Sequence, residues 1–417
     1  MTILIIGSGA REHALAWKFS KSNRLAGLFA APGNAGTAAV ANNLDDVDPV
    51  NAESVLRACR DNDINMVFVG PEAPLAAGVA DALTEAGIPV VGPHAKAARL
   101  ESSKSHSKSF MKNYKIPTAA YRSFSDAAAC AKYIRKVGHR VVVKKSGLAA
   151  GKGVLESDDQ ETLINFANDV IAAGDEVVVE ERLIGYEVSV FALSDGSSHI
   201  LLPPCTDYKK AGVNGTGPNT GGMGAICPVP WLKPDEMSRI ETEIVARTFD
   251  GLKDAGLSYV GVVYFGIMMT DDGPRLLEYN VRFGDPEAQV VIPLIKTDFA
   301  NLTEAMTQGG LSSFPLRYHD ASALGVVVAA PGYPGSYPKD IPVTSIPRDV
   351  DGETLVFHAS TRRDGETVVT GGGRCFTVVG LGREFLAARN RAYGAARNLH
   401  FEGGWFRPDI GGRIFGS

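Results

Sequence analysis

A strand, a glycine-rich loop and a second strand constrain the fold of this chain more than any other stretch. They occupy 141–155 and read VVVKKSGLAAGKGVL, in which the three valines are typical of a buried strand end. Gly147, Gly151 and Gly153 let backbone N–H groups approach an anion closely, and Lys152 adds a positive charge. The pattern predicts a flap over phosphates, with a plain glycine-rich hairpin as the alternative.

This stretch is not a P-loop. The spacing from Gly147 to Gly151 is one residue too short for G-x-x-x-x-G-K-[ST], and Gly153 takes the Ser/Thr position. Because no helix obviously follows, phosphates are expected beneath the flap and not on a helix N-terminus.

Length and charge limit the class of protein. The 417 residues are enough for roughly two to four domains with a large core. A net charge of −5 offers neither a basic face for nucleic acid nor a polybasic membrane anchor. No apolar run is long enough to span a membrane, Met1 leads straight into an expected strand, and the five widely spaced cysteines contain no CxxC pair. We therefore expect a cytoplasmic enzyme without nucleic-acid or membrane partners.

Residues 1 to 102 alternate apolar strands with amphipathic helices. Strands are expected at Thr2–Ile6, Leu28–Ala31, Met66–Val69 and Ile88–Val91, with helices at about Arg11–Phe19 and Ala76–Ala86. This alternation predicts a doubly wound parallel sheet, which binds ligands at the C-terminal ends of its strands.

Three loops at these strand ends carry candidate substrate-binding residues. These are Gly9 and Arg11, then Gly33, Asn34, Gly36 and Thr37, then Pro71 and Glu72. The second loop favours a cradle for one phosphate, with a plain surface loop as the alternative. A dinucleotide site is disfavoured, because Glu12 replaces the third glycine of G-x-G-x-x-G and the second strand ends without an acidic residue for ribose. His13 is expected to pack or to cap the helix start.

The central part opens with a polar run over 100–112. Its lysines, Lys104, Lys108 and Lys112, are mostly expected on a solvated helix face. Val177–Glu181 and Glu187–Ala192 are expected strands whose carboxylates suit a nucleoside, although ordinary strand ends look the same.

A second glycine-dense loop spans Gly215–Gly224, after Asp207. Its composition favours a binding loop over a linker, because the backbone can run close to a ligand there.

The strand expected at Leu276–Arg282 carries the clearest chemical pattern. A period of two places Glu278, Asn280 and Arg282 on one face. A carboxylate and a carboxamide suit Mg²⁺, and a guanidinium can clamp an anion. The alternatives are a solvated face and, for Arg282, an ion pair with Asp285 or Glu287.

From about residue 321 the chain forms a smaller unit. Ala323–Ala329 is an expected strand, Thr367–Thr370 and Cys375–Val379 are expected to form a hairpin around Gly371–Gly373, and Arg383–Asn398 is an expected helix.

These motifs, in this order, resemble those of ATP-grasp carboxylate–amine ligases. More narrowly, GPNTGGMG at 217–224 and RFGDPE at 282–287 resemble the phosphoribosylamine–glycine ligase family, and the match runs nearly end to end. The chain departs from that family at Lys145-Ser146, where Ala-Asp is usual. Unlike many other ATP-grasp enzymes, it has no carboxylate in the strand at Gly261–Met269.

The resemblance implies an α/β and α+β multidomain fold. It comprises an N-terminal Rossmann-like domain (1–102), an ATP-grasp domain (103–319) with a mobile lid at about 118–186, and a C-terminal α+β domain (320–417). The implied reaction joins glycine to 5-phosphoribosylamine through glycyl phosphate, with ATP as the phosphoryl donor. The alternatives are an ATP-grasp ligase of another acid, such as a carboxylase, and a non-catalytic nucleotide-binding subunit.

The resemblance also implies residue roles. ATP would be bound by Lys104, Lys144, Gly147, Gly151, Lys152 and Gly153 at its phosphates and by Glu180, Glu181 and Glu187 at its nucleoside, and Mg²⁺ or Mn²⁺ by Glu278 and Asn280. Catalysis would rest on Lys144, Asp207 and Arg282. Glycine and 5-phosphoribosylamine would be bound by Gly9, Arg11, Gly33, Asn34, Gly36, Thr37, Pro71, Glu72, Asp207, Asn219, Thr220, Gly221, Arg282 and Gly284. The amidotransferase of the preceding step is an expected transient partner.

Overall fold

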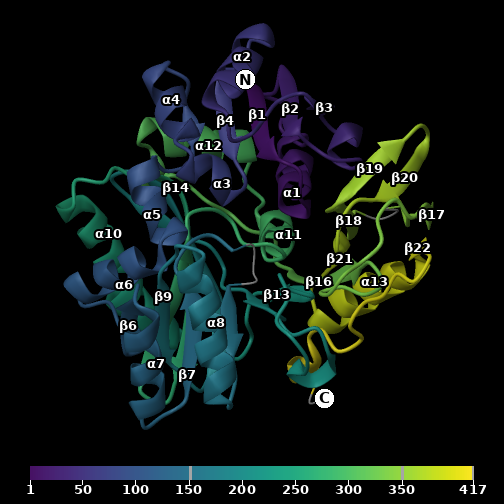
Figure 1. Ribbon diagram of the computed structural model, residues 1–417. Coiled ribbons are helices and arrows are strands. Elements are labelled where there is room, and N and C mark those ends of the chain that lie inside the picture. Colours follow the sequence, from purple (N-terminus) through teal and green to yellow (C-terminus); the bar gives the residue numbers. More distant parts are fainter. Residues whose placement is uncertain (150–152, 349–351, 416–417) are drawn as a thin grey trace.

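The computed structural model describes residues 1–149, 153–348 and 352–415, and its three successive segments occupy different parts of the molecule in Figure 1. The N-terminal segment lies at the top, the central segment fills the left side, and the C-terminal segment lies at the right. No helix within these described ranges is long and apolar enough to cross a membrane.

The N-terminal segment is a parallel sheet, ordered β3-β2-β1-β4-β5, with helices on both faces. Its elements are β1 (Thr2–Gly7), α1 (Ala10–Phe19), β2 (Gly27–Pro32), β3 (Asn42–Asn43), α2 (Ala52–Asp61), β4 (Met66–Val69), α3 (Glu72–Ala76), α4 (Val79–Glu85), β5 (Val90–Val91) and α5 (Ala95–Ser102). Ile3 and Ile5 of β1 pack in the same cluster as α1, whereas Leu4 and Ile6 pack with α2 and α4. Alternate side chains of a strand point to opposite faces, so this burial confirms the predicted doubly wound sheet.

Two predicted elements of this segment differ in detail. The helix expected at 76–86 is divided into α3 and α4 at Gly78, whose φ of +83° is left-handed. The strand expected from Ile88 begins only at Val90, because the Ile88 amide donates instead to Leu83 O at the end of α4.

The central segment is built on an antiparallel sheet ordered β11-β10-β14-β15. Its elements are α6 (Lys104–Asn113), β10 (Tyr186–Asp195), β11 (His199–Leu201), α9 (Pro234–Ile240), α10 (Ala246–Asp254), β14 (Val260–Thr270), β15 (Gly273–Asn280), α11 (Ala288–Val291) and α12 (Phe299–Gln308). Strand β15 ends at Asn280, so Glu278 and Asn280 lie on the strand and Arg282 lies just beyond it.

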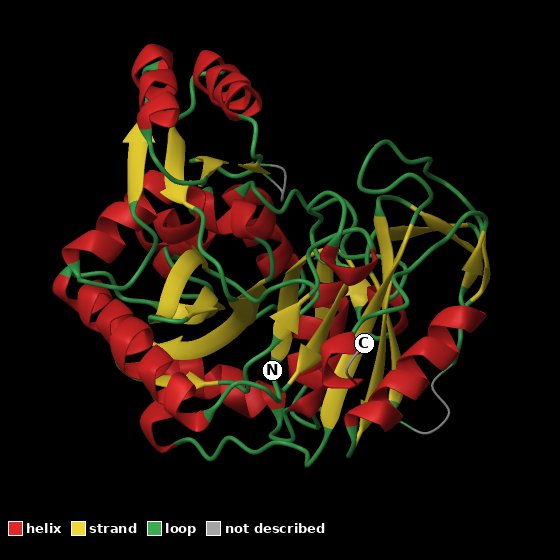
Figure 2. Ribbon diagram, turned by 90° about the horizontal axis from the view of Figure 1, so that it is seen from below, coloured by secondary structure: helices red, strands yellow, loops and turns green. Residues whose placement is uncertain are grey.

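A small unit inserted in this segment, here called the lid (121–181), has a sheet ordered β6-β9-β7-β8. Its elements are β6 (Tyr121–Phe124), α7 (Ala127–Lys136), β7 (Val141–Lys145), β8 (Val154–Glu156), α8 (Gln160–Ala172) and β9 (Val177–Glu181). It projects from the body at the upper left of Figure 2. Antiparallel pairing of Lys144 with Val154 confirms the two strands predicted on either side of the glycine-rich loop, of which 150–152 lie outside the described residues. Val143, Leu163 and Val179 belong to an apolar cluster that lies entirely within the lid.

The C-terminal segment shares a sheet with part of the central segment, in the order β12-β13-β16-β21-β18. The elements are β12 (Thr206–Asp207), β13 (Gly224–Cys227), β16 (Ser322–Ala329), β17 (Val343–Ser345), β18 (Thr354–His358), β19 (Thr361–Asp364), β20 (Thr367–Thr370), β21 (Arg374–Gly382), α13 (Phe385–Asn398) and β22 (His400–Phe401). The predicted hairpin of β20 with β21 is wrong. Strand β20 pairs with β19 across Gly365, and the largely buried β21 lies between β16 and β18, where both of its edges are hydrogen-bonded.

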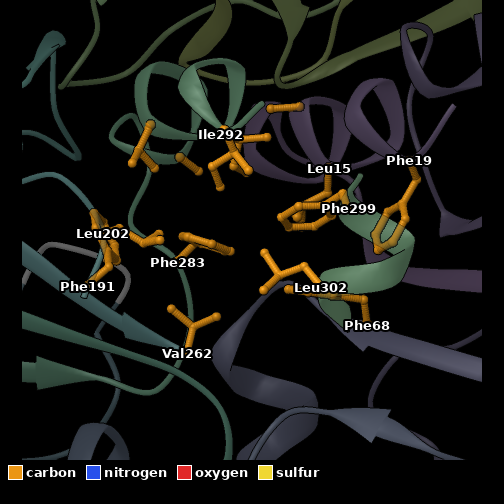
Figure 3. Packing of buried hydrophobic residues seen from close by; sticks show 14 of the residues in the cluster. Leu15, Phe19, Phe68, Phe191, Leu202, Val262, Phe283, Ile292, Phe299 and Leu302 are labelled. Carbon is orange, nitrogen blue, oxygen red and sulfur yellow. The ribbon is translucent and has the colours of Figure 1, made fainter. Parts of the chain in front are cut away.

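One apolar core joins all three segments. Figure 3 labels residues that the N-terminal and central segments contribute to it. Phe283 lies at its centre, stacked on Phe68 with ring centroids 6.3 Å apart and tilted against Phe191 at 5.5 Å. Phe357 of the C-terminal segment belongs to the same cluster. Because Phe283 follows Arg282, the end of the polar strand is anchored on this shared core.

Candidate active site

A cavity of about 880 Å³ lies where the three segments meet. The predicted site residues that line it are Arg11, Pro71, Glu72, Lys104, Lys144, Gly153, Glu180, Glu181, Glu187, Asp207, Asn219, Thr220, Gly221, Glu278, Asn280, Arg282 and Gly284. Among the described residues, the predicted Gly9, Gly33, Asn34, Gly36, Thr37 and Gly147 do not line it. Gly151 and Lys152 lie outside the described residues.

The loop predicted to cradle a phosphate is closed on itself. Asn34 Oδ1 accepts hydrogen bonds from the backbone N–H groups of Gly36 (2.8 Å) and Thr37 (2.9 Å), and Asn34 N donates to Thr37 Oγ1 (2.7 Å). The amides of Gly33 and Ala35 donate to main-chain oxygens. All five amides from Gly33 to Thr37 are therefore used within the protein, as is common where Asn competes for local backbone groups. This geometry does not support the predicted phosphate contact.

The Glu12 side chain fills the loop after β1, where a dinucleotide would need space. Glu12 Oε2 accepts a hydrogen bond from Gly9 N at 2.6 Å, and a Cβ added to Gly7 would lie 2.6 Å from Glu12 Cγ. The protein's own carboxylate thus occupies the N-terminus of α1, in keeping with the disfavoured dinucleotide site. His13 is a packing residue, as expected: it is buried, and its Nδ1 accepts from His358 N at 2.9 Å. Burial, followed by the nearby His358, lowers its pKa to about 3.

Two lysines converge on one buried carboxylate of the lid sheet. Glu180 Oε2 lies 2.8 Å from Lys108 Nζ and 3.1 Å from Lys144 Nζ. Burial alone raises the pKa of Glu180, but the two lysines outweigh it and lower the pKa. Burial lowers the pKa of Lys108 to about 8, against the opposing effect of Glu180. The Lys108 side chain is only 2% exposed, so its assignment to a solvated helix face is wrong.

A second charged group lies around Lys209. Its Nζ lies 2.5 Å from Glu187 Oε2 and 2.9 Å from Asp207 Oδ1. Lys209 lowers the pKa of Glu187, whereas burial raises the pKa of Asp207 even though Lys209 opposes it. Burial and Asp207 together raise the pKa of Glu287, which also lines the cavity, to about 7. This part of the cavity therefore carries more carboxylates than cations.

The proposed metal ligands leave their oxygens available. Glu278 makes no hydrogen bond or ion pair within the described part of the chain. Both neighbours of the Asn280 amide are hydrogen-bond acceptors, so the amide nitrogen faces them and donates to Glu101 Oε1 (2.9 Å) and Tyr279 O (3.2 Å). The Asn280 oxygen then points away from Glu101. A carboxylate and a carboxamide oxygen that line this cavity fit Mg²⁺, which takes few protein ligands. No cluster of three His, Cys, Asp or Glu in the described ranges offers another metal site.

Arg282 is held by two carboxylates from the N-terminal segment. Its Nε lies 3.2 Å from Glu72 Oε2, and its Nη2 lies 2.6 Å from Glu101 Oε1. The alternative pairing with Asp285 or Glu287 is wrong. Asp285 is 3.4 Å from Arg374 Nη1, and Glu287 accepts a hydrogen bond from Ser189.

Several cavity residues were missed. They are Glu101, Lys108, Lys209, Glu287, Arg374, Arg407 and Arg413. Lys209 was visible beside Asp207 in the sequence, and Glu287 was visible in RFGDPE. No neighbouring residue in the sequence indicates a role for Arg374. Arg374 lies in the C-terminal segment, and its Nη1 donates to Gly221 O (2.5 Å) and Asp285 O (2.9 Å) of the central segment. At the departure Lys145-Ser146, Lys145 pairs with Asp175 (3.4 Å) and Ser146 Oγ accepts from Ser105 N (3.1 Å).

Lys108 and Lys144 meet at Glu180, and Glu278 and Asn280 lie on another sheet of the same cavity. Residues 102–288 match an ATP-grasp domain, which defines the class. The biotin carboxylase domain of Hydrogenobacter thermophilus 2-oxoglutarate carboxylase, solved with MgADP, shares the fold alone: its TM-score is 0.73 at 18% identity, over 97% of this chain and 91% of that chain.

Similarity to more closely related proteins identifies the family within the ATP-grasp class. The three successive parts match phosphoribosylglycinamide synthetase: its N domain at 1–101, its ATP-grasp (A) domain at 102–288 and its C domain at 323–413. The chain is 46% identical to phosphoribosylamine–glycine ligase of Rhizobium meliloti (strain 1021), over 99% of this chain and 98% of that protein. The crystal structure of the Thermotoga maritima phosphoribosylamine–glycine ligase has a TM-score of 0.86 at 35% identity, over 98% of this chain and 100% of that chain.

The chain belongs to the phosphoribosylamine–glycine ligase family. It is also 44% identical to the trifunctional purine biosynthetic protein adenosine-3 of Gallus gallus, over 99% of this chain. It spans 42% of the length of that protein.

Proposed function

We infer that this chain is an ATP-dependent C–N ligase that joins glycine to 5-phosphoribosylamine. The products are 5′-phosphoribosylglycinamide, ADP and phosphate, in the second step of de novo purine biosynthesis. The observation that carries the inference is the joint lining of one cavity by the Lys144–Glu180 group and the Glu278–Asn280 pair, in a member of this family. One group suits the nucleotide, and the other suits the metal that accompanies its phosphates.

The proposed course runs through glycyl phosphate. A glycine carboxylate oxygen attacks the γ-phosphorus of ATP and ADP leaves. The amine nitrogen of 5-phosphoribosylamine then attacks the acyl carbon, phosphate leaves, and the nitrogen loses a proton. No covalent nucleophile of the protein is required, so catalysis consists of positioning and charge stabilisation.

The roles of the residues are proposed from where they lie. Lys104 and Lys144 bind the ATP phosphates together with the flap, and Glu180, Glu181 and Glu187 bind the nucleoside. Glu278 and Asn280 would hold Mg²⁺ or Mn²⁺, which neutralises phosphate charge when bound. Arg11, Glu72, Asp207, Arg282 and residues 219–221 of the glycine-dense loop line the same cavity, and we propose that they bind glycine and the amine.

We also propose the division into domains at 1–102, 103–319 and 320–417, with a lid that closes over ATP. A cytoplasmic location and a transient contact with the preceding amidotransferase complete the proposal. Such a contact would suit a labile amine.

The test is ADP release measured with glycine and 5-phosphoribosylamine each omitted in turn. Release should depend on glycine, and formation of the glycinamide product should require both substrates. Release that depends on bicarbonate and not on glycine would instead support a carboxylase. The absence of any ADP release with intact nucleotide binding would support a non-catalytic subunit.

A further inference from the structure

Glu101, the penultimate residue of α5, carries three hydrogen bonds at the end of β15. Its Oε1 accepts from Arg282 Nη2 at 2.6 Å, and it lies 2.9 Å from the end of the Asn280 amide, which can donate to it only when the amide nitrogen faces Glu101. Its Oε2 accepts from the backbone N–H of Val281 at 2.7 Å. Glu101 itself is only 8% exposed, and it lines the cavity together with Asn280 and Arg282. One carboxylate therefore touches a proposed metal ligand and the two residues that follow it.

The two ends of an Asn side chain have nearly the same shape and opposite chemistry. The oxygen can bind a hard cation, whereas the NH₂ group can only donate hydrogen bonds. Asn280 lines the cavity, so the orientation of its amide decides which end meets the ion. Both oxygens of Glu101 already accept hydrogen bonds, from Arg282 and from Val281 N, so this carboxylate presents an acceptor to Asn280 and attracts the nitrogen end.

We propose that Glu101 is a positioning residue that orients the Asn280 amide so that its oxygen faces the metal. The proposal rests on the function proposed above, in which Asn280 is a metal ligand. Tyr279 O lies 3.2 Å from the same amide nitrogen and favours the same orientation. The hydrogen bond from Val281 N to Glu101 fixes the backbone beside Asn280. Glu101 therefore holds Asn280 in two ways, through the Asn280 side chain and through the main chain next to it.

This arrangement makes the metal site depend on two segments. Glu101 belongs to the last helix of the N-terminal segment, whereas Asn280 belongs to the central sheet. Glu72, from α3, provides a matched comparison. It contacts Arg282 from another side at 3.2 Å and makes no hydrogen bond with Asn280 within the described residues.

The first test is Glu101→Gln, read as Mn²⁺ binding by electron paramagnetic resonance with ADP present, without turnover. The glutamine NH₂ group can donate to the Asn280 oxygen, which turns the Asn280 nitrogen toward the ion. We expect the Mn²⁺ dissociation constant to rise about 10- to 100-fold, the usual effect of losing an outer partner of a metal ligand. ADP affinity without metal should stay close to that of the unmodified protein. Unchanged Mn²⁺ affinity would overturn the proposal.

Two further variants separate orientation from general damage. Glu72→Gln weakens the hold on Arg282 but spares Asn280, so its Mn²⁺ affinity should remain that of the unmodified protein. The double variant Glu101→Gln/Asn280→Asp should regain most of the lost Mn²⁺ affinity, because a carboxylate presents oxygen in either orientation. Equal loss in Glu72→Gln, or no recovery in the double variant, would each overturn the proposal.

The readout is also independent of the ligase reaction. If ADP release proved not to depend on glycine, the proposed function would fail, and the binding experiment would still decide the role of Glu101.

Discussion

Arg282→Lys tests whether the guanidinium at the end of β15 acts on substrate or only holds the protein together. Arg282 donates from Nε to Glu72 (3.2 Å), from Nη2 to Glu101 (2.6 Å) and from Nη1 to Phe283 O (3.0 Å). A lysine ammonium is a single point charge and cannot span both carboxylates as the planar fork does. At least one charge-assisted hydrogen bond is lost, which destabilises the fold by roughly 1.5–3 kcal/mol.

The catalytic effect should exceed what this destabilisation explains. If Arg282 also stabilises the anion formed at the reacting carboxylate, turnover should fall about 100-fold, equivalent to about 2.7 kcal/mol in the transition state. The assay is turnover at saturating substrates, well below the midpoint of thermal unfolding, with that midpoint measured by circular dichroism.

A core variant supplies the control for lost stability. Leu302 is fully buried in the shared core, and Leu302→Ala should cost about 2–5 kcal/mol through the cavity it leaves. This variant should keep near-normal turnover when cool. If Arg282→Lys behaves in the same way, with lowered stability and near-normal turnover, the reasoning is refuted and Arg282 serves the fold alone.

Two further predictions concern the metal ligands and the buried lysine. Glu278→Gln and Asn280→Ala should each lower turnover at least about tenfold. The affinity for ADP without metal, measured by calorimetry, should change little. Normal turnover of either variant at saturating Mg²⁺ would show that the substituted residue is not a metal ligand. Burial of Lys108 lowers its pKa from 10.5 to about 8, so below pH 8 the folded state carries the penalty of a buried charge, and this penalty fades as the pH rises toward 10.5. Relative to Lys108→Met, the unmodified protein should therefore gain about 2 kcal/mol in its urea-derived free energy of unfolding between pH 7.5 and 9.5. Parallel pH profiles of the two proteins would contradict a depressed lysine pKa.

Local patterns were enough to predict the parts of the fold that local chemistry decides. The apolar alternation around Ile3–Ile6 predicted the doubly wound sheet, and the period of two over Glu278 and Asn280 placed both side chains at one cavity. The two strands on either side of the glycine-rich loop were also confirmed. In each of these cases the information lies within a few neighbouring residues.

Two of the misses depend on partners far away in the chain. Lys108 looks solvated in sequence because its counter-charge, Glu180, lies in the lid. The glycine run before β21 suggested a hairpin with the preceding strand. Strand β21 instead pairs with β16 and β18, and this pairing depends on the assembled sheet. The phosphate cradle was misleading for a different reason. Asn34 satisfies the very amides that make such a loop look like an anion site.

The lid has a hydrophobic core of its own, and this bears on how the protein can come apart. Cys130 and Ile134 of α7, Ile164 of α8 and Val141 of β7 belong to a cluster that includes none of the core residues of the body. Cooperative units of this kind open with a local free energy below that of global unfolding. Hydrogen exchange should therefore treat the lid as a separate foldon. A core substitution within it would first appear as a smaller fraction of molecules able to hold nucleotide, while the body remained folded.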